Sequence, residues 1–392
     1  MRDVFIVGYL RTPISRTYRD QPERDVFYNV RPDELAAIVI KELINRAKID
    51  PQEVDECIMG SARMGGVQWS YGGRLISLRA GLPFETAGIG VDRQCASAMT
   101  AINIGFMEIA LGISDTIIAG GYEHMSRLPI GVGVDIDPKL FEAEKRFDWW
   151  IALNMGLTAE KLAEESGITA REMAEWSCRS HMLAWKAYSE GYFKDEIIPI
   201  EITLPDGSKQ VIDRDLSIRS DTSVEKILSL PPAFKPGGVI NAGNSSPLNT
   251  GAAAVLLMSR ERMEKYGLKP LAKIKGYAYA GVDPSVMGKG PVPATRKLLS
   301  KYNLKVKDID YWEINEAFAV VTLYAVKELK IDPNKVNIKG GAIAIGHPLG
   351  MTGARLIGTL ARILKIHNGN LGVATLCVGG GQGVATLIEN VD

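Results

Sequence analysis

The sequence IDPQEVDECIMGS at residues 49–61 joins an amphipathic helical pattern, which begins near residue 34, to an apolar strand that ends in Gly60-Ser61. The sequence LKVKDIDYWEINEA at residues 304–317 repeats this order behind a helical pattern that begins near residue 294. In both halves we expect a further strand that leads through a small-residue turn into a helix, and later an apolar strand that runs into glycines. Alternating strands and helices favour α/β sheets with helical cover. The repeat therefore predicts two related α/β domains with a site between them.

A region of different character separates the two halves. It contains a helical run over 157–191, followed by a polar stretch with Pro205-Asp206-Gly207 and Pro231-Pro232. Long insertions of this kind usually carry specificity or cover a site. We therefore expect an N-terminal domain at 1–124 plus 248–269, an inserted loop domain at 125–247, and a C-terminal domain at 270–392.

The composition excludes several classes of protein. The chain has 392 residues, of which 46% are hydrophobic, and its 46 Lys and Arg equal its 46 Asp and Glu. A nucleic-acid-binding protein would usually be basic. The least charged stretch, 101–121, contains Glu108, Gly112 and Asp115 and fits a buried helix and strand better than a membrane span. Because we see neither a signal peptide at the N-terminus nor a peroxisomal tripeptide at the C-terminus, we expect a cytoplasmic enzyme.

Cysteine spacing argues against a metal site. None of the four cysteines forms a C-x-x-C pair, so a zinc ribbon or a thioredoxin-like site is not expected. Cys57 and Cys178, like His181 and His367, lie in strand or helix patterns without a glycine-rich turn, which favours structural roles.

Cys95 lies in the turn VDRQCASA at 91–98, between a predicted strand end and a helix predicted to run to about residue 111. A thiol at a helix N-terminus faces unpaired N–H groups, which stabilise the thiolate and lower its pKa. The alternative is a small core residue in a tight turn. These residues alone do not decide between the two.

His347 lies in the loop GGAIAIGHPLG at 340–350, directly before a proline suited to a helix start. From a loop tip it could take a proton from a thiol, or it could be a hydrogen-bonded structural histidine. The glycines around it favour function, because glycine lets ligand atoms approach the backbone closely.

Two further motifs precede or follow strands. Cys377 opens CVGGGQG at 377–383, but the residues after these glycines are β-type, which argues against a dinucleotide-binding loop. The N–H group of Gly379 could donate to an oxyanion, or the glycines could form a structural hairpin. Asn315 ends a strand at a position that commonly lines α/β sites, although it could simply cap the next helix.

Taken together, these motifs resemble the thiolase family. The resemblance covers essentially the whole chain, in order: Arg11-Thr12-Pro13, the Cys95 turn, GGYEHMS at 120–126, MGLTAE at 155–160, GNSS at 243–246, GAAA at 251–254, NEAF at 315–318, and the His347 and Cys377 loops. It implies duplicated α/β domains in five layers, αβαβα, with an inserted loop domain. It also implies transfer of an acyl group between CoA and acetyl-CoA, either as Claisen condensation of two acetyl-CoA to acetoacetyl-CoA or as thiolysis of a 3-ketoacyl-CoA.

The resemblance also implies a role for each site residue. Cys95 would be the acylated nucleophile, His347 its base, and Cys377 the acid/base that moves the α-proton. Asn315 would hold a water that completes one oxyanion hole with His347, and the N–H groups of Cys95 and Gly379 would form a second. Ser246, Met155 and Arg219 match positions that contact CoA.

The same resemblance sets expectations for cofactors and partners. CoA and acyl-CoA would bind as substrates, without a metal or a tightly bound cofactor, and the chain would form homodimers or homotetramers. A ketoacyl synthase-type condensing enzyme should lack the Cys377 loop. A non-catalytic thiolase-like lipid carrier should have lost Cys95 or His347. Asn154, where short-chain members often have His, leaves the acyl chain length open.

Overall fold

A computed structural model describes residues 1–204 and 206–391. Pro205, within the predicted polar stretch, and Asp392, at the end of the predicted C-terminal domain, lie outside the described residues. One mixed sheet runs through the molecule. Its strands are, in spatial order, β10 (Tyr311–Ile314), β11 (Leu371–Val378), β12 (Gln382–Glu389), β9 (Ala272–Gly281), β1 (Val4–Arg11), β8 (Asn249–Ser259), β5 (Thr116–His124), β3 (Glu56–Gly60) and β4 (Ala87–Val91), with β2 (Ser15–Arg16) also paired to β8.

The strand pairing repeats in the two halves, which agrees with the duplication that the sequence predicts. In the first half β5 is parallel to β3 and antiparallel to β8, which is antiparallel to β1. In the second half β11 is parallel to β10 and antiparallel to β12, which is antiparallel to β9. The two halves join where Phe5 and Ile6 of β1 pair with Lys273 and Ala272 of β9. The repeat is therefore built into the register of one continuous sheet.

One predicted strand is wrong. The first half has β4 beside β3, but the strand expected before the His347 turn is reduced to a single parallel bridge between Trp312 and Val336. Pro333 begins a 3-10 helix just before the bridge, and Asn337 takes a positive φ of 48° just after it. Because both flanking segments leave the extended conformation, only Val336 pairs.

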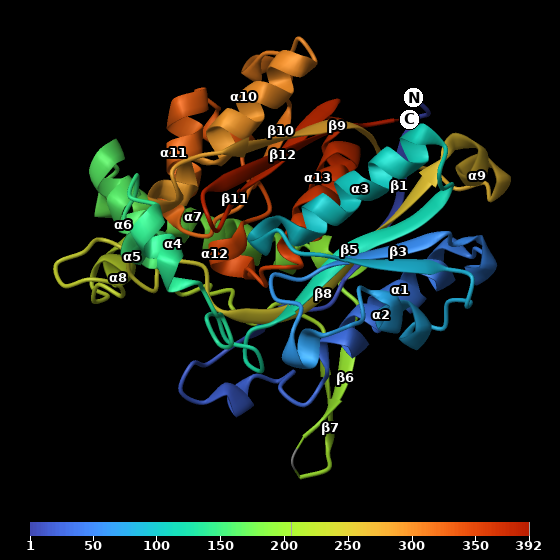
Figure 1. Cartoon of the computed structure of the whole chain (residues 1–392), viewed down its shortest axis with the longest axis horizontal. Helices are drawn as coiled ribbons and strands as arrows, with labels where there is room; N and C mark the ends of the chain where they lie inside the picture. Colours follow the sequence, from blue (N-terminus) through green and yellow to red (C-terminus); the bar gives the residue numbers. More distant parts are fainter. Residues whose placement is uncertain (205, 392) are drawn as a thin grey trace.

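Three layers of helices alternate with the two halves of the sheet, which gives the five layers αβαβα that the sequence predicts (Figure 1). The outer layers hold α1 (Pro32–Ala47) and α2 (Arg74–Arg79) on one side and α10 (Pro291–Lys301) and α11 (Ala319–Leu329) on the other, with α3 (Ser97–Leu111) and α13 (Thr352–His367) in the middle. Successive side chains of a strand point to opposite faces, so each strand serves two cores. In β8, Ala254 and Leu256 pack on the α1 side, whereas Val255 and Leu257 pack in the middle layer.

Residues 125–248 lie between β5 and β8. They contain α4 (Pro138–Ala143), α5 (Trp149–Leu153), α6 (Met155–Ser166), α7 (Ala170–Ser189), β6 (Ile200–Thr203), β7 (Lys209–Ile212) and α8 (Val224–Leu228); α9 (Arg260–Lys265) and the one-turn α12 (Ala342–Ile345) lie outside this region. At the corresponding place in the second half, a short glycine turn joins β11 to β12. A buried Arg11 anchors the region to β1 through Glu196 (2.8 Å) and Asp215 (2.7 Å). The domain boundaries themselves stay predictions.

No helix in the described part of the chain is long and apolar enough to cross a membrane.

Candidate active site

The Cys95 turn is fixed by its own side chains. The carboxylate of Asp92 accepts the N–H of Gln94 (2.8 Å), and the hydroxyl of Ser97 accepts the N–H of Arg93 (2.9 Å) while it donates to the carbonyl of Gln94 (2.7 Å). These contacts shape a 3-10 helix over Gln94–Ala96, directly before α3. The partly buried Cys95 therefore lies at the helix start, as predicted.

The predicted decrease in the pKa of Cys95 is wrong. Burial raises the pKa of this thiol to about 11, and the negative charge of Glu123 adds to the increase. Hydrogen bonds from the backbone of Gly379 and of Cys95 itself lower the pKa, but by less. Desolvation penalises the charged form and here outweighs the N–H groups at the helix start. Cys95 is consequently a thiol, not a thiolate, before substrate binds.

His347 is buried in a single, defined tautomer. The hydroxyl of Thr352 donates to the carbonyl of Pro348 (2.7 Å), so its oxygen must accept from Nδ1 of His347, 2.6 Å away. Nδ1 then carries the proton, which leaves Nε2 unprotonated, with a lone pair that accepts from Nδ2 of Asn315 (3.3 Å). Burial, with a smaller contribution from Arg355, lowers the pKa of His347 to about 3, so the imidazole is neutral.

The His347 loop is held from three sides. Its main-chain N–H donates to Oδ1 of Asn249 at the start of β8 (2.8 Å). Gly346 has φ +119°, and a Cβ there would lie 2.5 Å from Ile14. A Cβ on Gly341 would collide with the carboxylate of Glu316. The glycines of this loop thus serve close packing on protein atoms, which corrects the expectation that they admit ligand atoms.

Asn315 links His347 to the second half of the sheet. Its Nδ2 lies 3.3 Å from Nε2 of His347, and its N–H donates to Thr375 of β11 (3.0 Å). Its buried Oδ1 has no hydrogen-bond partner among the described residues. A buried acceptor without a partner is costly unless a water or substrate atom satisfies it.

Cys377 and Gly379 lie at the end of β11. Cys377 is 1% exposed, and burial together with the nearby Cys95 raises its pKa well above the ordinary value. The chain then turns into β12, so the predicted hairpin is present. A Cβ on Gly379 would lie 3.7 Å from Gln94 and 3.8 Å from Met155. The structure therefore brings Cys95, Cys377 and Gly379 together, beside the pair formed by Asn315 and His347.

Of the three residues expected to contact CoA, two lie next to the candidate site and one lies on the surface. Met155 begins α6 and faces Gly379, and the N–H of Ser246 donates to Ala317 (2.9 Å), two residues from Asn315. Arg219 is exposed, and its N–H donates to Nδ1 of His181 (3.2 Å). Met155 and Ser246 thus border the site, whereas Arg219 lies on the surface of the inserted region.

Sequence reasoning missed two residues that orient the site. Thr352 fixes the tautomer of His347, and Asn249 fixes its main chain. Thr352 occupies the first turn of the helix that follows His347-Pro348, which is a local signal. Asn249 lies 98 positions away along the chain, and only the fold brings it to His347.

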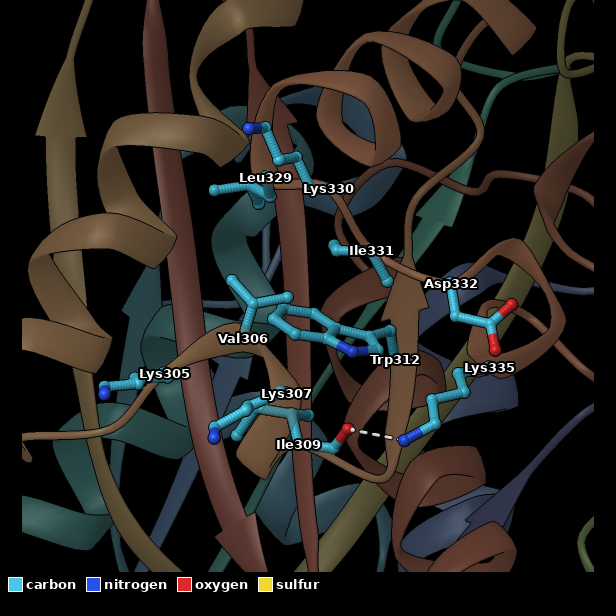
Figure 2. Close-up of a pocket in the computed structure, with 10 residues that line it drawn as sticks. All are labelled: Lys305, Val306, Lys307, Ile309, Trp312, Leu329, Lys330, Ile331, Asp332 and Lys335. Carbon is cyan, nitrogen blue, oxygen red and sulfur yellow. Dashed lines mark hydrogen bonds between the residues drawn. The ribbon is translucent and has the colours of Figure 1, made fainter.

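A hollow of about 430 Å³ beside β10 is not part of this site (Figure 2). None of the candidate catalytic or CoA-contacting residues lines it, and its floor is apolar, with Trp312 1% exposed. The ammonium groups of Lys305 and Lys307 lie on one side of the hollow and that of Lys330 on another, and that of Lys335 donates to the carbonyl of Ile309 (3.4 Å). Since the cations do not converge, the hollow lacks the geometry of an anion site.

Comparison with known proteins identifies the family. The thiolase N-terminal domain matches residues 4–261 and the thiolase C-terminal domain matches residues 268–390, so the chain belongs to the thiolase family. It is 45% identical to the 3-ketoacyl-CoA thiolase of Marinobacter nauticus and 43% identical to that of Hahella chejuensis, over 100% of this chain and 99% of each relative. The chain is therefore an acyltransferase of the thiolase type.

Solved structures agree. The acetyl-CoA acetyltransferase of Bacillus anthracis superposes with a TM-score of 0.88 at 40% identity, covering 100% of this chain and 99% of that one. Human mitochondrial 3-ketoacyl-CoA thiolase in complex with CoA also gives 0.88, at 35% identity, covering 100% and 98%. These matches support the five-layered fold and CoA-dependent chemistry.

Proposed function

We propose that Cys95 carries the acyl group, that Nε2 of His347 is its base, and that Cys377 moves the α-proton. The observation that supports this most strongly is the tautomer of His347, because its unprotonated Nε2 carries the lone pair that a general base requires. Both thiols have raised pKa values, so each begins the cycle protonated.

The steps balance from these protonation states. His347 takes the proton of Cys95 as the sulfur attacks the thioester carbonyl; CoA departs and takes a proton from Cys377. The Cys377 thiolate removes an α-proton from a second acetyl-CoA, and the enolate attacks the acyl group on Cys95. The released Cys95 sulfur recovers its proton from His347. Thiolysis is the same sequence in reverse.

Oxyanion stabilisation is assigned to two sets of donors. Asn315, through a bound water, and His347 would serve one developing oxyanion, which fits the buried and unpartnered Oδ1 of Asn315. The N–H groups of Cys95 and Gly379 would serve the other, since both already lie against the Cys95 sulfur. Preorganised donors of this kind usually make the largest single contribution to catalysis of acyl transfer.

CoA would bind reversibly, without a metal or a tightly bound cofactor, between the inserted region and the two core domains, with Met155 and Ser246 near its thiol end and Arg219 near its phosphates. A structure with CoA bound tests this placement, and a nucleotide bound elsewhere would refute it. That the enzyme works in the cytoplasm stays a prediction.

The decisive experiment is incubation with acetyl-CoA followed by peptide mass spectrometry. We expect one acetyl group on Cys95. Thiolysis rates with free CoA across 3-ketoacyl chain lengths would then define the preferred substrate. Absence of any acetyl-Cys95, in protein that degrades acetoacetyl-CoA, would refute the assignment of the nucleophile.

We also propose a homo-oligomer assembled through β4. Within the described residues β4 pairs only with β3, which leaves its other edge open. Ile89 on this edge is 39% exposed, and Phe84 in the turn before it is 84% exposed. The unpaired N–H and C=O groups of an edge strand can pair with another strand, and exposed apolar side chains beside them favour such an interface.

A further inference from the structure

The GGYEHMS motif at 120–126 contains a buried carboxylate that the proposed chemistry does not use. Glu123 lies in β5 and is 2% exposed. Its Oε2 accepts the main-chain N–H groups of Ala62 (2.9 Å) and Gly350 (2.8 Å), and its Oε1 accepts from Nε2 of Gln68 (2.5 Å). Burial raises the pKa of this carboxyl to about 7, against these hydrogen bonds, which lower it.

One of these contacts leads to the Cys95 turn. The carbonyl of Ala62 accepts a hydrogen bond from Nε2 of Gln94 (3.1 Å), and Gln94 immediately precedes Cys95. Glu123 therefore holds the residue against which the Cys95 turn is anchored.

The other contact leads to the His347 loop. Gly350 follows His347 by three positions, and its carbonyl accepts the N–H of Ala98 in the first turn of α3 (3.1 Å). A Cβ on Gly350 would lie 2.5 Å from Cα of Ser61. The segment that follows His347 is thus tightly packed between Glu123 and the start of α3, the helix that follows Cys95.

We propose that Glu123 is a positioning residue, whose single oxygen Oε2 holds the Cys95 turn and the His347 loop in fixed register. The proposal rests on the roles proposed above for Cys95 and His347. One oxygen that accepts a main-chain N–H group from each segment fixes the distance between them, and a buried N–H group left without its acceptor is costly. A misplacement of about 1 Å between reacting groups can cost a hundredfold in rate. Loss of this carboxylate should therefore slow acylation rather than weaken substrate binding.

The test measures acetylation of Cys95 in single turnovers across acetyl-CoA concentrations. For Glu123→Ala we expect the maximal rate constant to fall about tenfold to a hundredfold, with the half-saturating concentration changed by less than about twofold. Glu123→Gln keeps an acceptor oxygen for both N–H groups and should recover to within about threefold of the wild-type rate constant. Loss of a merely structural residue would lower the fraction of folded protein. It would not lower the maximal rate constant of the folded enzyme at an unchanged half-saturating concentration.

Asp310→Ala is the matched control, because a single oxygen of Asp310, Oδ2, also accepts two main-chain N–H groups, those of Asn370 (2.8 Å) and Leu371 (3.0 Å), at the end of β11 that lies away from Cys377. Its acetylation rate constant should match that of the wild type. A wild-type maximal rate in Glu123→Ala, or an equal loss in Asp310→Ala, would overturn the proposal.

If Glu123→Ala does not fold, the Gln94→Met variant provides the test. It removes the hydrogen bond between the Gln94 side chain and the carbonyl of Ala62 while it keeps a side chain of similar size. A slower acetylation at unchanged half-saturation is expected, and a wild-type rate overturns the proposal. Failure of the wild-type protein to form acetyl-Cys95 would instead refute the proposed function itself.

Discussion

At the scale of single residues, burial sets the chemistry of this site. It keeps both Cys95 and Cys377 protonated and His347 neutral. An imidazole with so low a pKa cannot hold the Cys95 proton in the resting enzyme. With the roles proposed for Cys95 and His347, proton transfer must therefore accompany attack on the thioester, which avoids an oxidisable thiolate between turnovers.

The roles proposed for Cys95 and Cys377 should be separable by substitution. Cys95→Ser should abolish both acetyl labelling and turnover, because an alkoxide is much harder to generate than a thiolate. Cys377→Ser should leave labelling from acetyl-CoA largely intact, since CoA can leave as a thiolate and take a proton from water. Its condensation rate should fall by about a hundredfold or more.

Mass spectrometry and a coupled condensation assay measure these two effects. Equal loss of acetyl-enzyme in both variants, with both folded, would contradict this division of labour. Full condensation activity in Cys377→Ser would show that another group moves the α-proton.

Alkylation by iodoacetamide should report the raised pKa of Cys95. Because thiolate is the reactive form, its alkylation rate should rise steadily between pH 7 and 10 and reach no plateau below the pKa of about 11. Cys57, fully buried with its pKa raised to about 12, should react more slowly and serves as the internal control. A plateau near pH 8 would show that the resting thiol is activated after all.

The low pKa of His347 should make the free energy of unfolding depend on pH in the acidic range. Its pKa is lowered from 6.5 to about 3 on folding, so below pH 6.5 the unfolded chain binds a proton that the native protein does not. This contribution to stability is complete above pH 6.5 and is lost as the pH falls toward 3, at up to about 1.4 kcal/mol per pH unit. His347→Asn should therefore lose less stability than the wild type between pH 6.5 and 4.5, measured by urea unfolding. Parallel loss in both proteins would contradict a buried neutral imidazole.

At the scale of elements, the sequence predicts those whose signal is local. The helix and strand that flank residues 49–55, their counterparts around 304–310, and the hairpin after Cys377 all follow from period and turn residues. The missing strand before His347 depended on Asn337, whose positive φ cannot be read from a single Asn between Val336 and Ile338. The positions of Thr352, Asn249 and Glu123 against the site depend on tertiary contacts, and the pKa of Cys95 depends on burial, so neither could be derived from local pattern.

Gly346 allows a direct test of the tight His347 loop. Gly346→Ala must adopt φ near +119° and place its Cβ 2.5 Å from Ile14, so we expect a loss of about 3 kcal/mol or more in stability and a slower acetylation rate. Gly267→Ala is the control, because Gly267 also has a positive φ (60°) but its Cβ would meet nothing within 4 Å. Its cost should be about 1 kcal/mol. Equal costs would show that neither the close packing nor the φ of +119° and ψ of 165° at Gly346 costs more than an ordinary left-handed glycine position.

At the scale of the whole molecule, duplication places the four motifs. The Cys95 turn follows β4 and the His347 turn follows its one-residue counterpart at Val336, so both loops meet at the helices of the middle layer. The inserted region and the Cys377 hairpin occupy equivalent connections, after β5 and after β11. One connection thus became the proposed CoA-binding cover while the other stayed short and supplies Cys377 and Gly379. The repeat accordingly predicted a site between the halves before any single motif could.

The same topology leaves β4 at an open edge, which leads to a prediction about assembly. If a second copy pairs along this edge, Ile89→Asp would place a charge without a partner in the interface. We expect light scattering to show a dimer or tetramer for the wild type. For Ile89→Asp we expect a dissociation constant raised at least about a hundredfold, equivalent to about 2.7 kcal/mol.

Ile366→Asp is the matched control for this substitution, because Ile366 is 53% exposed in the last turn of α13, beside β10 at the other end of the sheet. It should keep the wild-type assembly. A wild-type protein that stays monomeric at all concentrations, or an Ile366→Asp variant that dissociates equally, would show that β4 is not the interface. Because Gly60 at the end of β3 packs directly on the start of α3, loss of the β4 contact should also loosen the Cys95 turn. Dissociated Ile89→Asp should therefore acetylate Cys95 more slowly than assembled enzyme, with rates that recover as protein concentration restores the oligomer.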